Sequence, residues 1–210
     1  MFNKQKQIDY YSNLLQEHGD HYLSLDWKSP DSQNERFKIF KDLIEMFGLY
    51  NPSILDIGSG FGDLYAYLKK ELARFSYTGY DINPSLVENA KKKYRDGRFE
   101  VKDVLEGGLK TFDFVVCCGT LNISFDEREK HLDYIYAMLR KMFQLCKTAV
   151  GVNFLSSQAI YYLKNEDLSL RQYFYTKVEE LLPLIKSLTG RYVIRHDYNP
   201  ADFTVYLIKN

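Results

Sequence analysis

A chain of 210 residues with 45% hydrophobic and 27% charged residues has the size and composition of one globular domain, which excludes disordered and fibrous classes. Its 28 basic and 28 acidic side chains balance, so the one-signed charge typical of phosphate-backbone binding is absent and nucleic acid is disfavoured as a partner. The first eleven residues are polar and no apolar run reaches membrane-spanning length, so we expect a cytoplasmic protein without membrane contact.

Residues 1–50 are predicted to form an N-terminal helical cap ahead of the main fold. The apolar spacing indicates helices over 5–15 and 34–47, and the stretch 25–32 between them is predicted to be a loop broken by Pro30. Residues 51–210 are expected to form the main domain, in one structural unit with the cap.

From residue 53 onward, short apolar strands alternate with longer amphipathic helices, which is typical of a parallel sheet covered on both faces. Asn83 and Pro84 supply a capping side chain and a first-turn proline to the second of these helices. Cys117 and Cys118 are adjacent in the fourth strand, so we expect these two thiols on opposite faces, buried and reduced like Cys146. The five strands are predicted over 54–57, 76–80, 99–102, 112–118 and 149–155.

The last quarter of the chain breaks this alternation. A helix over 178–188 precedes two strands over 192–196 and 203–208. Their connection, 197–202, is short enough to make the two strands an antiparallel pair. We therefore expect an α/β fold with a doubly wound, seven-stranded sheet that is mostly parallel and ends in an antiparallel C-terminal hairpin.

Three glycines at alternate positions, Gly58, Gly60 and Gly62, follow the first predicted strand and precede a helix. Glycine permits a tight turn at positive φ and lets the backbone approach a ligand closely. A dinucleotide site would require a third glycine where this chain has Asp63. A carboxylate there repels a pyrophosphate and suits a ligand with an ammonium or sulfonium centre.

Two more acids stand at the ends of the second and third predicted strands. Asp81 can accept hydrogen bonds from both hydroxyls of a ribose, as it also would in an NAD site. Asp103 can accept from the exocyclic amine of an adenine, while Val104 or Leu105 covers the ring. Together with Asp56, which ends the first strand, they place an acid at the ends of three consecutive strands.

These motifs make the segment 53–156 resemble the class I S-adenosylmethionine-dependent methyltransferase family, which has a Rossmann-like sheet with the seventh strand beside the fifth. By this resemblance, Asp56 and the glycines surround the methionine part of the cofactor, Asp81 the ribose and Asp103 the adenine. Residues 118–121, after the fourth strand, would contact the methionine and the methyl group. Trp27, Ser32, Gln33 and Arg36, with the stretch 195–198, are similar more loosely to a bacterial subgroup of small methyltransferases.

The cofactor expected from this resemblance is S-adenosylmethionine, and no spacing of His, Cys and Asp indicates a metal site. Arg36 is a candidate to hold the carboxylate of the cofactor or of an acidic methyl acceptor. The residues expected to contact the cofactor are Asp56, Gly58, Ser59, Gly60, Phe61, Gly62, Asp81, Ile82, Asp103, Val104, Gly119, Thr120, Leu121 and Arg36.

Methyl transfer is an in-line displacement with a good leaving group, so positioning can carry most of the rate and no catalytic side chain is obligatory. Asn122, His131, Asn153 and His196 are the polar candidates for a catalytic role. An aromatic content of 16% exceeds what a small core needs and favours a pocket for an organic ligand. Candidates for a lid over that pocket are Tyr161, Tyr162, Tyr173 and Tyr175.

The leading hypothesis is methylation of a small-molecule acceptor, at oxygen or nitrogen, by a monomer or homodimer. Zero net charge and the aromatic content favour it. The alternatives are methylation of RNA or protein, a non-catalytic module that binds S-adenosylmethionine, and an NAD-dependent enzyme, which Asp63 opposes.

Overall fold

The computed structural model describes residues 3–162 and 172–210 of the chain. Within these ranges, seven strands form one sheet in the order β3-β2-β1-β4-β5-β7-β6, with β1 to β5 parallel and β7 antiparallel to both neighbours. The predicted seven-stranded sheet with an antiparallel C-terminal pair is confirmed. The strands are Ser53–Ile57 (β1), Ser76–Asp81 (β2), Phe99–Val101 (β3), Phe112–Cys117 (β4), Cys146–Leu155 (β5), Tyr192–Arg195 (β6) and Asp202–Ile208 (β7).

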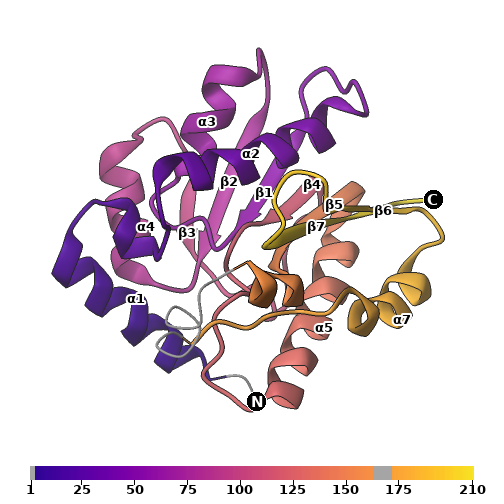
Figure 1. The fold of residues 1–210 in the computed structure, drawn as a ribbon. Coiled ribbons are helices and arrows are strands. Elements are labelled where there is room, and N and C mark those ends of the chain that lie inside the picture. Colours follow the sequence, from indigo (N-terminus) through magenta and orange to yellow (C-terminus); the bar gives the residue numbers. More distant parts are fainter. Residues whose placement is uncertain (1–2, 163–171) are drawn as a thin grey trace.

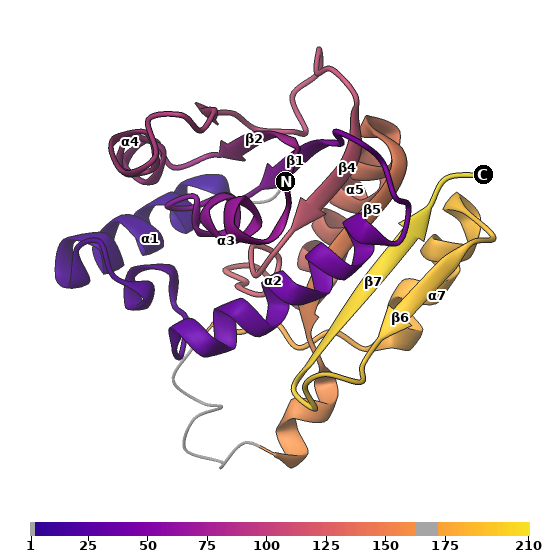
Figure 2. The same cartoon turned by 90° about the horizontal axis from the view of Figure 1, so that it is seen from above.

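Helices cover both faces of the sheet, with α2, α3 and α4 on one face and α5 and α7 on the other (Figures 1 and 2). No helix among the described residues is long and apolar enough to cross a membrane. The helices are Lys4–His18 (α1), Pro30–Glu45 (α2), Asp63–Glu71 (α3), Pro84–Lys93 (α4), Arg128–Leu145 (α5) and Val178–Leu188 (α7), with short 3-10 helices at Tyr22–Leu25 (η1) and Ser157–Tyr161 (η2).

Alternation along the strands divides the buried side chains into two cores. Ile54 of β1 packs with α2 and α3, whereas its neighbour Leu55 packs with α5. Cys117 and Cys118 separate in the same way, as predicted, because successive side chains along a strand point to opposite faces. Cys118 follows the last residue of β4 and is only partly buried, so the prediction that it is buried was wrong. The parallel register aligns Ile57 with both Tyr80 and Cys117, so the carboxyl ends of β1, β2 and β4 meet at one edge.

Two local predictions were wrong. The stretch 25–32 is not a loop broken by Pro30, because Pro30 begins α2, and the Ser29 hydroxyl accepts a hydrogen bond from the Ser32 N–H (3.1 Å) as its cap. A first-turn proline needs no hydrogen-bonded N–H, so it starts the helix rather than breaking it. The strand-helix alternation also fails between β3 and β4, where the connection 102–111 contains no helix.

The N-terminal fifty residues serve two parts of the fold. Helix α2 buries five apolar side chains against the sheet and α3, so it belongs to one of the two covering layers. Helix α1 instead lies across the strand ends, contacting the chain after β2, β3 and β4 (Figure 1). Within the first fifty residues, α1 and η1 therefore lie over the edge where the predicted site residues gather, and α2 reaches the same edge with Ser32 and Arg36.

Candidate functional site

The glycine turn after β1 adopts the backbone that its sequence predicts. Gly58, Gly60 and Gly62 have φ of 75°, 52° and 80°, in the left-handed region that side chains rarely adopt. A Cβ added at Gly58 would lie 1.8 Å from Thr120 Oγ1, so the turn also needs glycine for space. The Gly58 N–H donates to the Tyr80 carbonyl (2.7 Å), which ties the turn to the end of β2.

Asp81 stands at the end of β2 with its carboxylate fixed by backbone donors. Its oxygens accept hydrogen bonds from the N–H groups of Gly60 (2.9 Å) and Asn83 (2.9 Å). Burial raises the pKa of this carboxyl, and the backbone donors oppose that rise. The side chain lines the cavity described below, so a rigid hydrogen-bond acceptor faces any ligand there.

Asp56 offers a buried oxygen without a partner. Its Oδ2 accepts from the Tyr77 hydroxyl (2.6 Å), whereas Oδ1 has no hydrogen-bond partner among the described residues. Burial raises the Asp56 pKa to about 7, and the nearby carboxylates of Asp81 and Asp63 add to the rise while Tyr77 opposes it. A ligand that brings a cationic N–H donor would satisfy this oxygen and favour its ionised form.

Asp103, after β3, is held by the chain itself. Its Oδ1 accepts from the Leu105 N–H (2.8 Å), and Oδ2 forms an ion pair with Lys4 of α1. Val104 is buried beside it, and Tyr134 and Met138 of α5 complete an apolar wall of the same cavity. The sequence reasoning missed Tyr134, and it placed Met138 on an apolar stripe without assigning it to the site.

A cavity of about 350 Å³ lies over the carboxyl edge of the sheet. We call its two parts the turn end and the aromatic end. The turn end comprises Asp56, Gly58, Ser59, Gly60, Asp81, Ile82, Asp103 and Val104. The aromatic end comprises Trp27, Arg36, Gly119, Asn122, Leu155, Tyr173, Tyr175, Asn199 and Asp202. Of the other residues expected to contact the cofactor, Thr120 lines the cavity, whereas Phe61, Gly62 and Leu121 are buried and do not line it.

Asp63 lies in the first turn of α3 and also lines the cavity. Lys93 forms an ion pair with it (3.2 Å), so part of its charge is compensated within the protein. The expected repulsion of a pyrophosphate is therefore weaker than the sequence indicated, although Asp56, Asp81 and Asp103 keep the turn end acidic.

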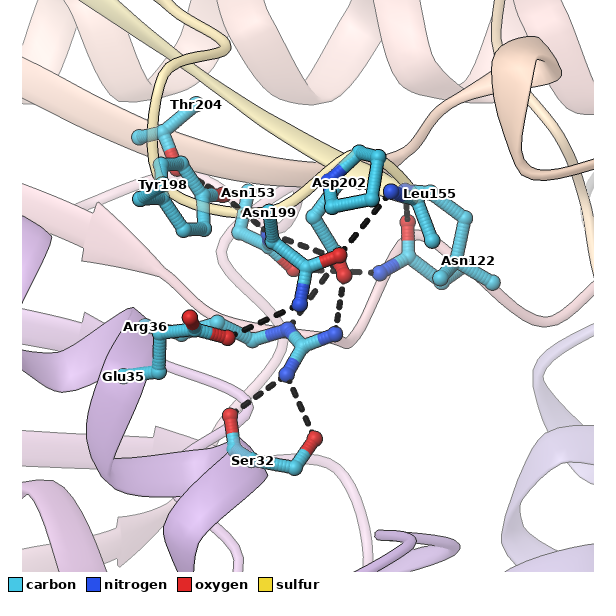
Figure 3. A network of polar contacts seen from close by, with 12 residues as sticks. Ser32, Glu35, Arg36, Asn122, Asn153, Leu155, Tyr198, Asn199, Asp202 and Thr204 are labelled. Atoms are coloured by element: carbon cyan, nitrogen blue, oxygen red, sulfur yellow. Dashed lines mark hydrogen bonds and ion pairs between the residues drawn. The ribbon is translucent and has the colours of Figure 1, made fainter. Parts of the chain in front are cut away.

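A buried polar network forms one wall of the aromatic end (Figure 3). Arg36 of α2 forms an ion pair with Asp202 of β7, and its Nη1 also donates to the Ser32 hydroxyl (2.7 Å). Arg36 was a candidate to hold a carboxylate of the cofactor or of the acceptor, but here it holds the carboxylate of Asp202. Burial raises the Asp202 pKa and the Arg36 guanidinium opposes the rise. The Arg36 guanidinium lies over the Trp27 ring, with its central carbon 5.2 Å from the ring centre.

Asn122 and Asn153 belong to the same network. Asn153 donates to Asp202 Oδ1 (3.2 Å) and accepts from Asn122 Nδ2 (3.2 Å), while Asn122 Oδ1 accepts from the Leu155 N–H (2.9 Å). One hydrogen on Arg36 Nη2 and one on Asn122 Nδ2 find no hydrogen-bond acceptor among the described residues, and both residues line the cavity. The wall therefore presents N–H donors to a ligand.

Neither of the two histidines proposed as catalytic candidates lines the cavity. His131 is fully buried in α5, with Nε2 2.9 Å from the Leu121 carbonyl oxygen, and burial lowers its pKa. His196 is exposed on the β6–β7 connection. Of the four tyrosines predicted as a lid, Tyr173 and Tyr175 line the cavity, whereas Tyr161 and Tyr162 are exposed at the end of η2. Residues 163–171, between the two pairs, lie outside the described residues.

Several cavity residues were not predicted from the sequence. Gln7 and Tyr11 of α1 line the cavity, as do Asn199 and Asp202 near the last strand. Their sequence signal was slight: Gln7 interrupts no apolar stripe, and Asp202 closes a polar connection that was interpreted only as a hairpin link. Gln7 and Asp202 reach the cavity only through contacts with residues far away in the sequence.

The turn end fits S-adenosylmethionine by its own chemistry. Gly58 has no Cβ, which lets Thr120 pack directly against the turn, and Asp56 Oδ1 is a buried oxygen that needs a donor. A cofactor with an ammonium and a sulfonium centre matches such an acid-lined site better than a dianionic pyrophosphate does.

Comparisons with known proteins agree with this fit. The family described as "Methyltransferase domain" matches residues 55–142. A Mycobacterium tuberculosis protein assigned as a methyltransferase is 27% identical over 164 residues, which span 75% of this chain and 93% of the relative. Demethylmenaquinone methyltransferase from Thermotoga maritima is 34% identical over 64 residues, covering 30% of this chain and 28% of that enzyme.

Solved structures share the fold. Magnesium protoporphyrin IX methyltransferase from Synechocystis PCC 6803 with bound S-adenosylhomocysteine (SAH) aligns with a TM-score of 0.66 at 15% identity, covering 98% of this chain and 94% of that one. The plantazolicin methyltransferase in complex with a triazolic desmethylPZN analogue and SAH aligns with a TM-score of 0.68 at 18% identity, covering 99% of this chain and 91% of that one. A methyltransferase domain is thus matched inside a sheet of this order, and the chain is an S-adenosylmethionine-dependent methyltransferase.

Proposed function

We propose that the chain methylates a small-molecule acceptor at nitrogen or oxygen. The observation that carries this proposal is the single cavity in which the acidic turn end continues into the aromatic end. Helix α1, η1 and the Tyr173–Tyr175 stretch enclose it, so an acceptor of limited size fits better than a folded polymer. The balanced charge of the chain also disfavours nucleic acid.

The proposed cofactor contacts follow the order of the strand ends. Asp81 accepts from the ribose hydroxyls, Asp103 accepts from the adenine amine, and Val104 with Ile82 covers the ring. Asp56 and the backbone from Gly58 to Gly62 surround the methionine part. In this arrangement cofactor binding breaks the ion pair between Lys4 and Asp103, and the adenine amine takes the place of Lys4 on the Asp103 carboxylate.

S-adenosylmethionine supplies the methyl group as an electrophilic carbon on a positively charged sulfur. The chain's part is to hold the methyl acceptor in line with that carbon, because a well-oriented nucleophile about 3 Å away removes most of the barrier. Trp27, Tyr173 and Tyr175 provide apolar surface for the acceptor, and Arg36 and Asn122 provide N–H donors for one of its oxygens. His131 and His196 do not line the cavity, so neither serves as a base in this proposal.

Residues 1–50 and 51–210 act in this proposal as one structural unit, since α2 supports both the sheet and the aromatic end. A limited digest tests this point: cleavage between the two parts should abolish SAH binding if they form one unit.

The proposed acceptor class is tested with methyl-labelled S-adenosylmethionine and three substrate sets: aromatic amines and phenols together with the low-mass fraction of a bacterial extract, RNA, and protein. We expect label in low-mass products. Label that appears only in RNA or only in protein would contradict the proposal. SAH binding without transfer to any set would instead favour a non-catalytic binding module.

A further inference from the structure

Gln7 is the only fully buried residue of α1 among the described residues. A single buried position on a helix is usually apolar, because burial of an amide without hydrogen bonds is costly. Gln7 is 3% exposed and lines the cavity. The position therefore calls for a partner to its side-chain amide.

Half of that amide is already satisfied. Gln7 Nε2 donates a hydrogen bond to the Thr120 carbonyl (3.2 Å). This contact fixes the orientation of the amide, because the flipped form would place Oε1 against another carbonyl oxygen. Oε1 has no hydrogen-bond partner among the described residues. Leaving such a buried oxygen unpaired is costly, so a donor is required from the ligand.

The unpaired oxygen lies at the junction of β1 and β4. Thr120 touches the turn, since its Oγ1 donates to the Ile57 carbonyl (3.3 Å) and occupies the space where a Gly58 Cβ would be. Asp56, two residues before Gly58, carries another buried oxygen without a partner. Two unsatisfied hydrogen-bond acceptors thus border the part of the cavity where the cofactor's methionine end is proposed to lie.

We propose that Gln7 Oε1 accepts a hydrogen bond from the ammonium group of the bound cofactor, so that α1 docks on the cofactor as well as on the protein. An ammonium has three N–H donors, enough to serve Asp56 and Gln7 together. The other cavity acids are engaged elsewhere: Asp81 by Gly60 and Asn83, Asp103 by Lys4 and Leu105. This inference rests on the cofactor placement proposed above.

The test compares two ligands that differ in the methionine part. SAH carries the ammonium, whereas 5′-methylthioadenosine lacks the amino-acid portion and keeps the adenosine. In Gln7→Met we expect SAH binding to weaken about tenfold, the loss of one hydrogen bond to a charged group, with methylthioadenosine binding unchanged. Calorimetric titration measures both affinities, and the fluorescence of Trp27, the single tryptophan, provides a second readout from the cavity.

Gln5→Met is the matched control, because Gln5 lies on the same helix but is exposed and donates only to Asp9. It should bind both ligands as the wild type does. Equal weakening of both ligands in Gln7→Met would assign Gln7 a merely structural role and overturn the proposal, as would no weakening of either.

Gln7→Glu keeps an oxygen that can accept from an ammonium, but like the methionine variant it loses the hydrogen bond from Nε2 to the Thr120 carbonyl, so the two variants are compared by their preference between the two ligands. Its preference for SAH over methylthioadenosine should equal or exceed that of the wild type. A preference as low as in Gln7→Met would contradict the role of Oε1. Failure of the proposed cofactor placement is recognised separately, because the wild type itself would then show no preference for SAH.

Discussion

The turn end and the aromatic end of the cavity are built in different ways. The turn end uses backbone at the ends of three consecutive strands, and its acids lie close in sequence to the strands that position them. The aromatic end joins η1, α2, the stretch after β4 and the last strand, and its central ion pair links Arg36 to Asp202 across 166 positions of sequence. The first is determined by the sheet, the second by long-range side-chain contacts.

This difference predicts which property, cofactor affinity or folding stability, a substitution at each end changes most. Changes at the turn end should alter cofactor affinity more than folding stability, because they touch ligand-facing backbone. Changes in the Arg36 network should alter stability more than cofactor affinity, because they leave a buried charge without its partner.

The largest effect is expected for Arg36→Met, which leaves the Asp202 carboxylate buried without its cation. The free energy of unfolding should fall by about 3–5 kcal/mol, as for other broken buried ion pairs. Arg195→Met is the control, since its ion pairs with Asp197 and Asp42 are partly exposed and contribute much less to stability than a buried pair does. Denaturant titration measures both, and equal losses in the two variants would remove the proposed contrast between the ends.

Gly58→Ala should weaken SAH binding about 100-fold or more, which corresponds to about 2.7 kcal/mol. The added Cβ clashes with Thr120 and the residue must also keep a positive φ. Gly108→Ala separates the two causes, because Gly108 has φ of 80° but no neighbouring atom within 4 Å of an added Cβ. If SAH affinity in Gly58→Ala stayed near that of the Gly108 variant, the close packing of Thr120 on the turn would be refuted as a requirement for cofactor binding.

Ionisation of Asp56 should make SAH binding depend on pH. With its pKa raised to about 7 by burial, Asp56 is protonated below that pH and loses its attraction for an ammonium. From one unit below to one unit above this pKa, SAH affinity should rise about tenfold, and Asp56→Asn should flatten the profile. A profile that keeps its slope in Asp56→Asn would assign the titration to another group, such as Asp81.

The same ionisation affects the unliganded protein. The folded state holds a proton on Asp56 that the unfolded state has already released above its usual pKa. The Asp56 contribution to stability therefore falls as pH rises from about 4 to about 7, and is constant above. The Asp56 contribution is measured as the difference in unfolding free energy between the wild type and Asp56→Asn over this pH range.

The smallest effect is expected for Lys4→Met, which frees Asp103 for the cofactor. The ion pair is partly exposed and worth at most about 1 kcal/mol, so SAH affinity should rise by no more than about fivefold. Lys6→Met, on an exposed position of the same helix, should leave affinity unchanged. Weaker binding in Lys4→Met would mean that docking of α1 matters more than release of Asp103.

The contrast between the ends also explains how far the sequence could be interpreted. The strands were predicted within a few residues because apolar runs and helix stripes are local, and the acids Asp56, Asp81 and Asp103 were found because strand ends meet at one edge. Pro30 was misread because a first-turn proline resembles a loop breaker. Asp202 and Gln7 were missed because only the folded chain brings them to the cavity.

A crystal structure of the SAH complex tests the central claim most directly. We predict the ribose hydroxyls on Asp81, the adenine amine on Asp103 with Lys4 displaced, and the ammonium between Asp56 and Gln7. A complex in which SAH binds with its ribose away from Asp81, or outside the turn end altogether, would contradict the account.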